Sequence, residues 1–165
     1  MKQWRHTVVS VVCLLAAGFV AYHNSFSGVF LFDDHPSILQ NPHVRHLWPL
    51  TGTPFNAPSY GGMAGRPVAI FTLALNYAWG GFHVWGYHLA NLLIHLLAAL
   101  TLFGLVRRTL LGKRLLTHYG HVATGLALTM ALLWTVHPLQ TESVTYIIQR
   151  SESLTGLFYL LTLLT

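Results

Sequence analysis

The sequence has 165 residues, of which 53% are hydrophobic and only 8% carry a charge. Because an ordinary soluble domain carries about a quarter charged residues, this chain has too few charges to cover a water-facing surface, and lipid is expected to take much of that role. Nine Lys and Arg residues outnumber four acids, but the bases cluster at the ends of apolar runs. That distribution is typical of membrane topology and argues against a nucleic-acid partner.

Four apolar runs are predicted to cross the membrane as helices, at about residues 7–22, 84–106, 121–136 and 154–165. The first is short, since a spanning helix needs about 17 residues, and a cleaved signal peptide is an alternative to the uncleaved anchor that we favour. The last run ends without a cap or basic flank, so we expect a longer protein. The predicted fold class is α: the N-terminal part of one polytopic transmembrane domain.

Polar segments separate these runs, at residues 23–83, 107–120 and 137–153. Within the first, Pro67–Trp79 is predicted to form a short helix, because proline suits a first turn and Gly80-Gly81 suits a helix end. This helix would lie along the membrane surface or pack on the spans.

The segment 137–153 is interpreted as an amphipathic helix that rests on the membrane surface after Pro138. Its polar face would carry Glu142, Tyr146, Gln149 and Ser153, and its apolar face Val144, Ile147 and Ile148. A plain connector with solvated charges is the alternative.

Charge asymmetry predicts the orientation. One side collects six bases and no acid: Lys2, Arg5, Arg107, Arg108, Lys113 and Arg114. The other side collects all four acids: Asp33, Asp34, Glu142 and Glu152. The positive-inside rule therefore places the N-terminus and residues 107–120 in the cytoplasm and both acidic segments, 23–83 and 137–153, on one extracytoplasmic face.

Asp33 and Asp34 are the first candidates for chemistry, because adjacent carboxylates repel and one holds its proton more tightly. Such a pair suits a general base or a ligand set for a divalent cation. A solvated turn is the alternative, since Asp near proline is common in turns.

Eleven histidines raise the question of a metal or haem site. His88, Asn91 and His95 fall on one face of the second predicted span. The third predicted span places histidine only at its two ends, and the sequence holds no paired-cysteine or His-Glu-x-x-His motif. We therefore assign no metal ligands and expect these side chains to join helices by hydrogen bonds.

Four motifs resemble one family in order along the chain. Residues 32–44 read FDDHPSILQNPHV, residues 65–68 read GRPV, residues 87–91 read YHLAN, and residues 137–144 read HPLQTESV, followed by Arg150-Ser151-Glu152. Together they resemble the membrane half of the transmembrane and tetratricopeptide-repeat O-mannosyltransferase-like family, which has the C-type glycosyltransferase superfold. Gln140 and Ser151-Glu152 depart from the residues that many relatives carry.

The resemblance implies a membrane glycosyltransferase. It would move mannose or a similar hexose from a polyprenyl-phosphate donor to a protein or other hydroxyl acceptor on the extracytoplasmic face. The catalytic candidates are Asp33, Asp34 and Glu142. The candidates for binding the donor and its phosphate are Arg150, Arg66, His137, Glu152 and His88. No cofactor is assigned, although a divalent cation is compatible with the aspartate pair, and inversion by single displacement is the simplest chemistry.

Two other functions stay open: a non-catalytic membrane anchor for a tetratricopeptide-repeat protein, and a lipid or sugar transporter. Intramembrane ionisable groups usually mark transport routes, whereas the polar residues of this chain concentrate in the outer segments. The short cytoplasmic N-terminus favours a bacterial inner membrane over the endoplasmic reticulum.

Overall fold

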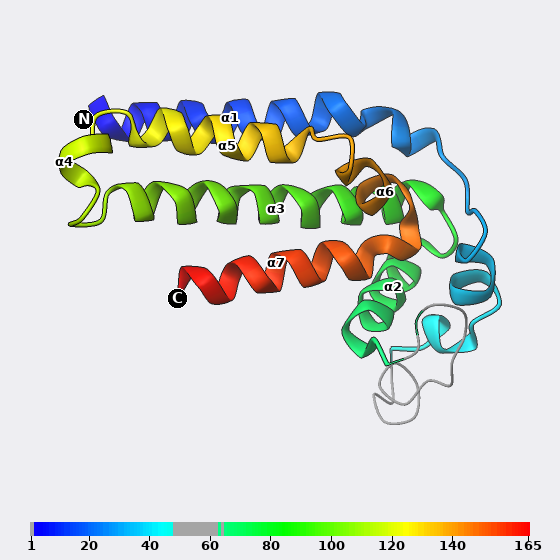
Figure 1. Ribbon diagram of the computed structural model, residues 1–165. Coiled ribbons are helices and arrows are strands. Elements are labelled where there is room, and N and C mark those ends of the chain that lie inside the picture. The colour runs from blue at the N-terminus through cyan, green and yellow to red at the C-terminus, as the bar shows by residue number, and fades with distance from the viewer. Residues whose placement is uncertain (1, 48–62, 64) are drawn as a thin grey trace.

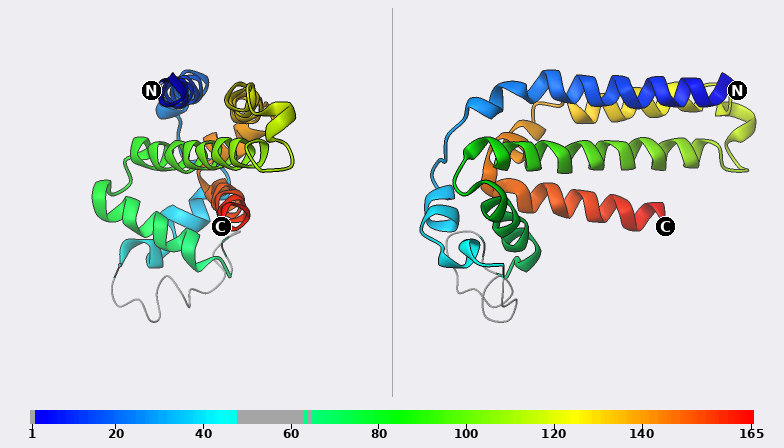
Figure 2. Two further views of the ribbon diagram at one scale, coloured as in Figure 1. Left: turned by 90° about the vertical axis from the view of Figure 1, so that its left-hand side faces the viewer. Right: turned by 180° about the vertical axis from the view of Figure 1, so that it is seen from behind.

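The computed structural model describes residues 2–47, 63 and 65–165, and this part of the chain is helical. Four of the described helices form a bundle: α1 (Lys2–Tyr22), α3 (Val84–Leu110), α5 (Ala123–Thr135) and α7 (Arg150–Leu164). In every view α3 lies between α7 and the pair formed by α1 and α5 (Figures 1 and 2).

Two stretches of the described chain are long and apolar enough to cross a membrane, Trp4–Ser27 with 24 residues and Val84–Leu110 with 27. They correspond to the first two predicted spans. Helix α5 is apolar but has only 13 residues, so at about 1.5 Å per residue it is shorter than the hydrocarbon core of a bilayer.

The polar segments lie at the two ends of the bundle (Figure 1). The N-terminus and the short helix α4 (Leu116–Tyr119) are at one end, with the basic loop that joins α3 to α5. Helices α2 (Pro67–Gly80) and α6 (Gln140–Thr145) are at the opposite end. We call this second end the rim. The two acidic segments therefore share one end of the molecule.

Helix α2 confirms the expected short helix. Pro67 lies in its first turn, and Gly81 follows its last residue with a φ of 57°, a backbone conformation that glycine adopts without a steric penalty. One face of the helix is buried in a core that includes Ile70, Leu73 and Tyr87. Helix α2 thus packs on the bundle.

Small residues bring α5 close to its neighbours. Ala123, Ala127 and Ala131 recur every four residues on the buried face of α5. Ala127 and Ala131 share a core with Leu14 of α1 and residues of α3. Because alanine adds little bulk, it lets helix backbones approach closely, as in membrane helix pairs.

The expectation of one amphipathic helix through residues 137–153 is wrong. Helix α6 ends at Thr145, Tyr146 is extended with a ψ of 116°, and a 3-10 turn, Ile147–Gln149, precedes α7. Two side chains from distant parts of the sequence form hydrogen bonds with backbone groups that would pair with one another in a continuous helix. The Asn91 amide donates to the carbonyls of Val144, Tyr146 and Ile147, and an Asp34 oxygen accepts from the Ile148 N–H.

The apolar face of that segment also differs from the prediction. Val144, Ile147 and Ile148 are buried in the protein core, where they pack with residues of other helices, and they do not form a lipid-facing stripe. Three core side chains and the Asn91 amide therefore fix this segment against α3. We call residues 146–149 the rim turn.

Candidate functional site

The structure gives the two adjacent aspartates different surroundings. Asp34 is only 1% exposed, and its oxygens accept hydrogen bonds from the backbone N–H groups of Leu31 (3.0 Å) and Ile148 (2.9 Å). Burial raises the pKa of the Asp34 carboxyl, and these two hydrogen bonds lower it in part. Asp34 therefore ties the first acidic segment to the rim turn, which is a structural contact.

Asp33, by contrast, is exposed. Its backbone N–H donates to the phenol oxygen of Tyr146 at 2.9 Å, so its main chain is fixed while its carboxylate faces outward. Of the two aspartates, Asp33 is therefore the one that is open to solvent.

Phe32 has a strained backbone immediately before Asp33. Its φ is 40°, in a region that bulky residues rarely adopt, and its side chain is 83% exposed. Such conformations cost about 1–3 kcal/mol and persist where the surrounding structure imposes them, often at functional sites. Here the hydrogen bonds of Asp33 and Asp34 hold the chain on the C-terminal side of the strained residue.

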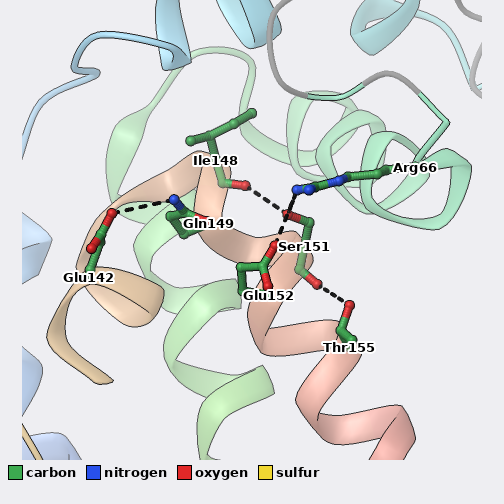
Figure 3. Close-up of polar contacts among 7 residues, drawn as sticks. All are labelled: Arg66, Glu142, Ile148, Gln149, Ser151, Glu152 and Thr155. Atoms are coloured by element: carbon green, nitrogen blue, oxygen red, sulfur yellow. Dashed lines mark hydrogen bonds and ion pairs between the residues drawn. The ribbon is translucent and has the colours of Figure 1, made fainter. Parts of the chain in front are cut away.

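A cleft of about 550 Å³ is lined by Phe32 and Tyr146, the preceding neighbour and the hydrogen-bond partner of Asp33, while Asp33 itself is not part of the lining. We call it the Glu142 cleft, and its lining includes Leu31, Phe32, Thr141, Glu142 and Tyr146. Glu142 is exposed, and one of its oxygens accepts a hydrogen bond from Gln149 of the rim turn at 3.4 Å (Figure 3). The cleft thus combines a carboxylate, a phenol and a hydroxyl with apolar walls.

A second cleft, of about 460 Å³, lies where α2 meets α7. We call it the Arg66 cleft. Arg66 Nη1 lies 3.4 Å from Glu152 Oε1 and also donates to the Ser151 hydroxyl (Figure 3). Val68, Leu154 and Phe158 supply apolar walls. Because the ion pair is about half exposed, it is open to exchange with an incoming anion.

Arg150 is fully buried. Its guanidinium donates to Asn91 Oδ1 at 2.7 Å and to the carbonyls of Thr72 (3.1 Å) and Tyr87 (3.0 Å). Burial lowers the pKa of Arg150 to about 9, which leaves the group charged at neutral pH. The side chain therefore joins α2, α3 and α7 at the rim, and the structure brings it to neither cleft.

Neither of the two candidate histidines lines the Glu142 cleft or the Arg66 cleft. His88 is 2% exposed, and neither of its ring nitrogens has a hydrogen-bond partner among the residues that the structure describes. A side chain at Gly28 would come within 2.8 Å of its Nε2. His137 is exposed, and its Nδ1 accepts from the Leu139 N–H at 3.2 Å.

Asn91 and His95 confirm the expectation that polar residues of this span join helices. The Asn91 amide forms hydrogen bonds with the rim turn and with Arg150. The Nε2 atom of His95 is hydrogen-bonded to the Thr135 carbonyl of α5 at 3.0 Å. The sequence pattern placed both residues on one face of a helix but gave no indication that Asn91 positions the rim turn. The pattern placed Tyr146 on the polar face of segment 137–153 but gave no indication that its partner is the Asp33 backbone.

Over nearly its whole length the chain is similar to proteins named protein O-mannosyl-transferase. Human TMTC4 is 32% identical over 98% of the chain, and Drosophila melanogaster Tmtc1 is 35% identical over 91%. Human TMTC1 is 33% identical over 92%. Over most of its length the chain is therefore TMTC-like in sequence. No protein-family model and no solved structure matches it.

The TMTC-like chain spans about a fifth of the length of these relatives, 22% of human TMTC4 and 17% of Drosophila Tmtc1. The similarity agrees with the resemblance drawn from the ordered motifs. In this TMTC-like chain the motif around Asp33 and Asp34 and the motif around Glu142 meet at the rim, where Tyr146 and Ile148 contact the aspartates.

Proposed function

We propose that this chain forms part of a membrane glycosyltransferase that moves mannose or a similar hexose from a polyprenyl-phosphate donor to a hydroxyl of a protein acceptor. The relatives' name, protein O-mannosyl-transferase, supports the reaction class. The observation that carries the site is the exposed Asp33, whose backbone N–H donates to the Tyr146 phenol that lines the Glu142 cleft, while its neighbour Asp34 is buried.

Asp33 is the proposed general base. The acceptor oxygen attacks the anomeric carbon of the sugar, the bond from that carbon to the phosphate oxygen breaks, and the hydroxyl proton passes to the Asp33 carboxylate. One displacement of this kind inverts the anomeric centre. Glu142, exposed in the same cleft, accepts hydrogen bonds from the sugar or the acceptor.

The Arg66 cleft is the proposed donor site. The departing phosphate gains negative charge, and a guanidinium binds phosphate oxygens through two parallel hydrogen bonds. Arg66 sits at the charged part of the cleft, and Leu154 and Phe158 of α7 offer apolar walls for the isoprenoid chain. The Glu152 carboxylate holds the Arg66 guanidinium in place until the donor phosphate displaces that carboxylate. His137 is a further donor candidate, whereas the burial of Arg150 and His88 favours supporting roles for both.

The proposed topology puts the rim on the extracytoplasmic side of a multi-pass protein, with the N-terminus in the cytoplasm. All four acids lie at the rim end, and the sequence at the opposite end is basic. This arrangement holds for a bacterial inner membrane, which the sequence favours, and equally for the endoplasmic reticulum.

The test compares Asp33→Asn, Asp34→Asn and Arg66→Gln in the full-length protein, with transfer of labelled sugar from a polyprenyl-phosphate donor to a peptide as the readout. Loss of the base lowers kcat by about 10²- to 10⁴-fold in Asp33→Asn with no loss of folding. Arg66→Gln raises the donor KM. Full activity of Asp33→Asn would remove the catalytic assignment. A wild-type protein without any transfer would favour the anchor function, and sugar crossing vesicles unchanged would favour a transporter.

A further inference from the structure

A third cleft lies at the opposite end of the bundle from the rim. It measures about 560 Å³ and is lined by residues of α1, α3 and α5 and of the loop before α5. His6, Arg107 and His121 contribute the basic groups, and Val9, Leu111 and Leu128 are among the apolar residues. The proposed transferase chemistry uses none of these residues.

Arg107 is held in this cleft by a contact between helices. Its Nε donates to the hydroxyl of Thr124 on α5 at 3.1 Å, so the side chain reaches from α3 across to α5. The guanidinium has four further N–H groups on Nη1 and Nη2, which suit the oxygens of a phosphate. The Thr124 contact thus orients the fork before a ligand arrives.

The charge of the surroundings selects an anion. Residues 1–22 and 107–122 contain Lys2, Arg5, Arg107, Arg108, Lys113 and Arg114, and they contain no acid. A zwitterionic headgroup would bring its ammonium close to these bases, whereas an anionic headgroup would not. Basic pockets between membrane helices on the cytoplasmic side bind acidic lipid headgroups for this reason.

The surface next to the cleft suits acyl chains. Val9 of α1 and Val122, which directly precedes α5, line the cleft and are exposed, and Leu128 of α5 adds a further apolar residue to the lining. A molecule with a phosphate at Arg107 and hydrocarbon along these helices would satisfy both parts of the surface. A free phosphate would leave the apolar part uncovered.

We propose that this cleft binds the headgroup of an anionic phospholipid, with its phosphate at Arg107 and its acyl chains along α1 and α5. This site lies at the end of the bundle away from Asp33 and is independent of the proposed transferase function.

Two glycines provide matched steric variants. A Cβ added at Gly125, which lines the cleft, meets no atom within 4 Å, so we expect Gly125→Leu to extend into the cleft. Gly104 of α3 has the same free space and does not line the cleft, so Gly104→Leu is its control. Arg107→Gln removes the central cation, and Arg114→Gln removes one exposed charge from the loop as its control.

The experiment measures lipid retained by the full-length protein in detergent after incubation with equal amounts of phosphatidylglycerol and phosphatidylcholine. Washing in about 1 M NaCl shortens the Debye length to about 3 Å, so loosely attracted lipid is removed while lipid in a cleft stays. We expect the wild type and both controls to retain phosphatidylglycerol in preference to phosphatidylcholine. Arg107→Gln should retain about fivefold less, and Gly125→Leu should show a similar loss.

Three results would overturn the proposal. They are equal retention of the two lipids by the wild type, undiminished retention by Arg107→Gln and Gly125→Leu, and displacement of the lipid by millimolar inorganic phosphate. The last would identify a site for a soluble anion. Melting temperatures of all variants, which we expect to match the wild type, separate loss of binding from loss of folding.

Discussion

Replacement of Arg150 by methionine tests whether this residue joins helices or binds the sugar donor. The side chain is fully buried and donates to Asn91 Oδ1 and to two backbone carbonyls, at distances of 2.7 to 3.1 Å. Its loss leaves Asn91 Oδ1 without this donor, at a cost of about 1–3 kcal/mol, and removes two further hydrogen bonds from a charged group to the helix carbonyls of Thr72 and Tyr87. Relief from burying the charge offsets part of that cost, so we expect a net loss of about 3 kcal/mol.

The assay is thermal unfolding of the protein in detergent. A loss of that size lowers Tm by about 6–12 °C for a chain of this length. Arg150→Lys should recover only part of the loss, because an ammonium cannot reproduce the planar fork. Arg114→Met, at an exposed position, is the control and should change stability by less than about 0.5 kcal/mol.

One outcome would refute this reasoning. Suppose that Arg150→Met unfolds at the same temperature as Arg114→Met while the donor KM rises. Arg150 would then bind the donor directly, and its three hydrogen bonds would not contribute to stability. A fall in Tm with an unchanged donor KM would support the structural role.

Three further predictions concern the rim and its support. Because burial raises the pKa of Asp34, the unfolded chain loses this proton first as pH rises above 3.8, so stability falls with rising pH until the folded group also ionises. Asp34→Asn should remove that slope from melting curves taken at about pH 4 to 6. Gly28→Ala brings a Cβ to 2.8 Å from His88 Nε2 and 2.9 Å from the Ser25 carbonyl, and should lower Tm, whereas Gly104→Ala should not. Arg66→Gln should change the free energy of unfolding by less than about 1 kcal/mol, because its ion pair is half exposed, and a larger loss in denaturant titrations would contradict the proposed exchangeable pair.

Local signals predicted the parts of this fold that depend on local chemistry. The backbone preferences of Pro67 and Gly81 fix the two ends of α2, and both residues can be recognised from the sequence alone. The apolar runs of α1 and α3 could be predicted because the length and apolarity of a spanning helix are properties of a single segment.

The rim turn was not predictable, because it depends on contacts between distant residues. Asn91 lies 53 to 56 residues from the carbonyls it contacts, and Asp34 lies 114 residues from Ile148. Helical periodicity at residues 140–153 suggested one helix, and these tertiary contacts override it. The sequence also could not show that Asp33 is exposed and Asp34 buried. Two adjacent residues of the same type differ only in the surroundings that the fold gives them.

The attachment of the rim turn to α3 has a consequence for the kinetics of the proposed reaction. Tyr146 of the turn lines the Glu142 cleft, and the Asn91 amide of α3 donates to two carbonyls of the turn, those of Tyr146 and Ile147. Because these contacts hold the turn in place, a ligand that enters the Glu142 cleft is expected to leave the position of the turn unchanged. Donor and acceptor should therefore add in random order, with little change in the affinity for one when the other is bound.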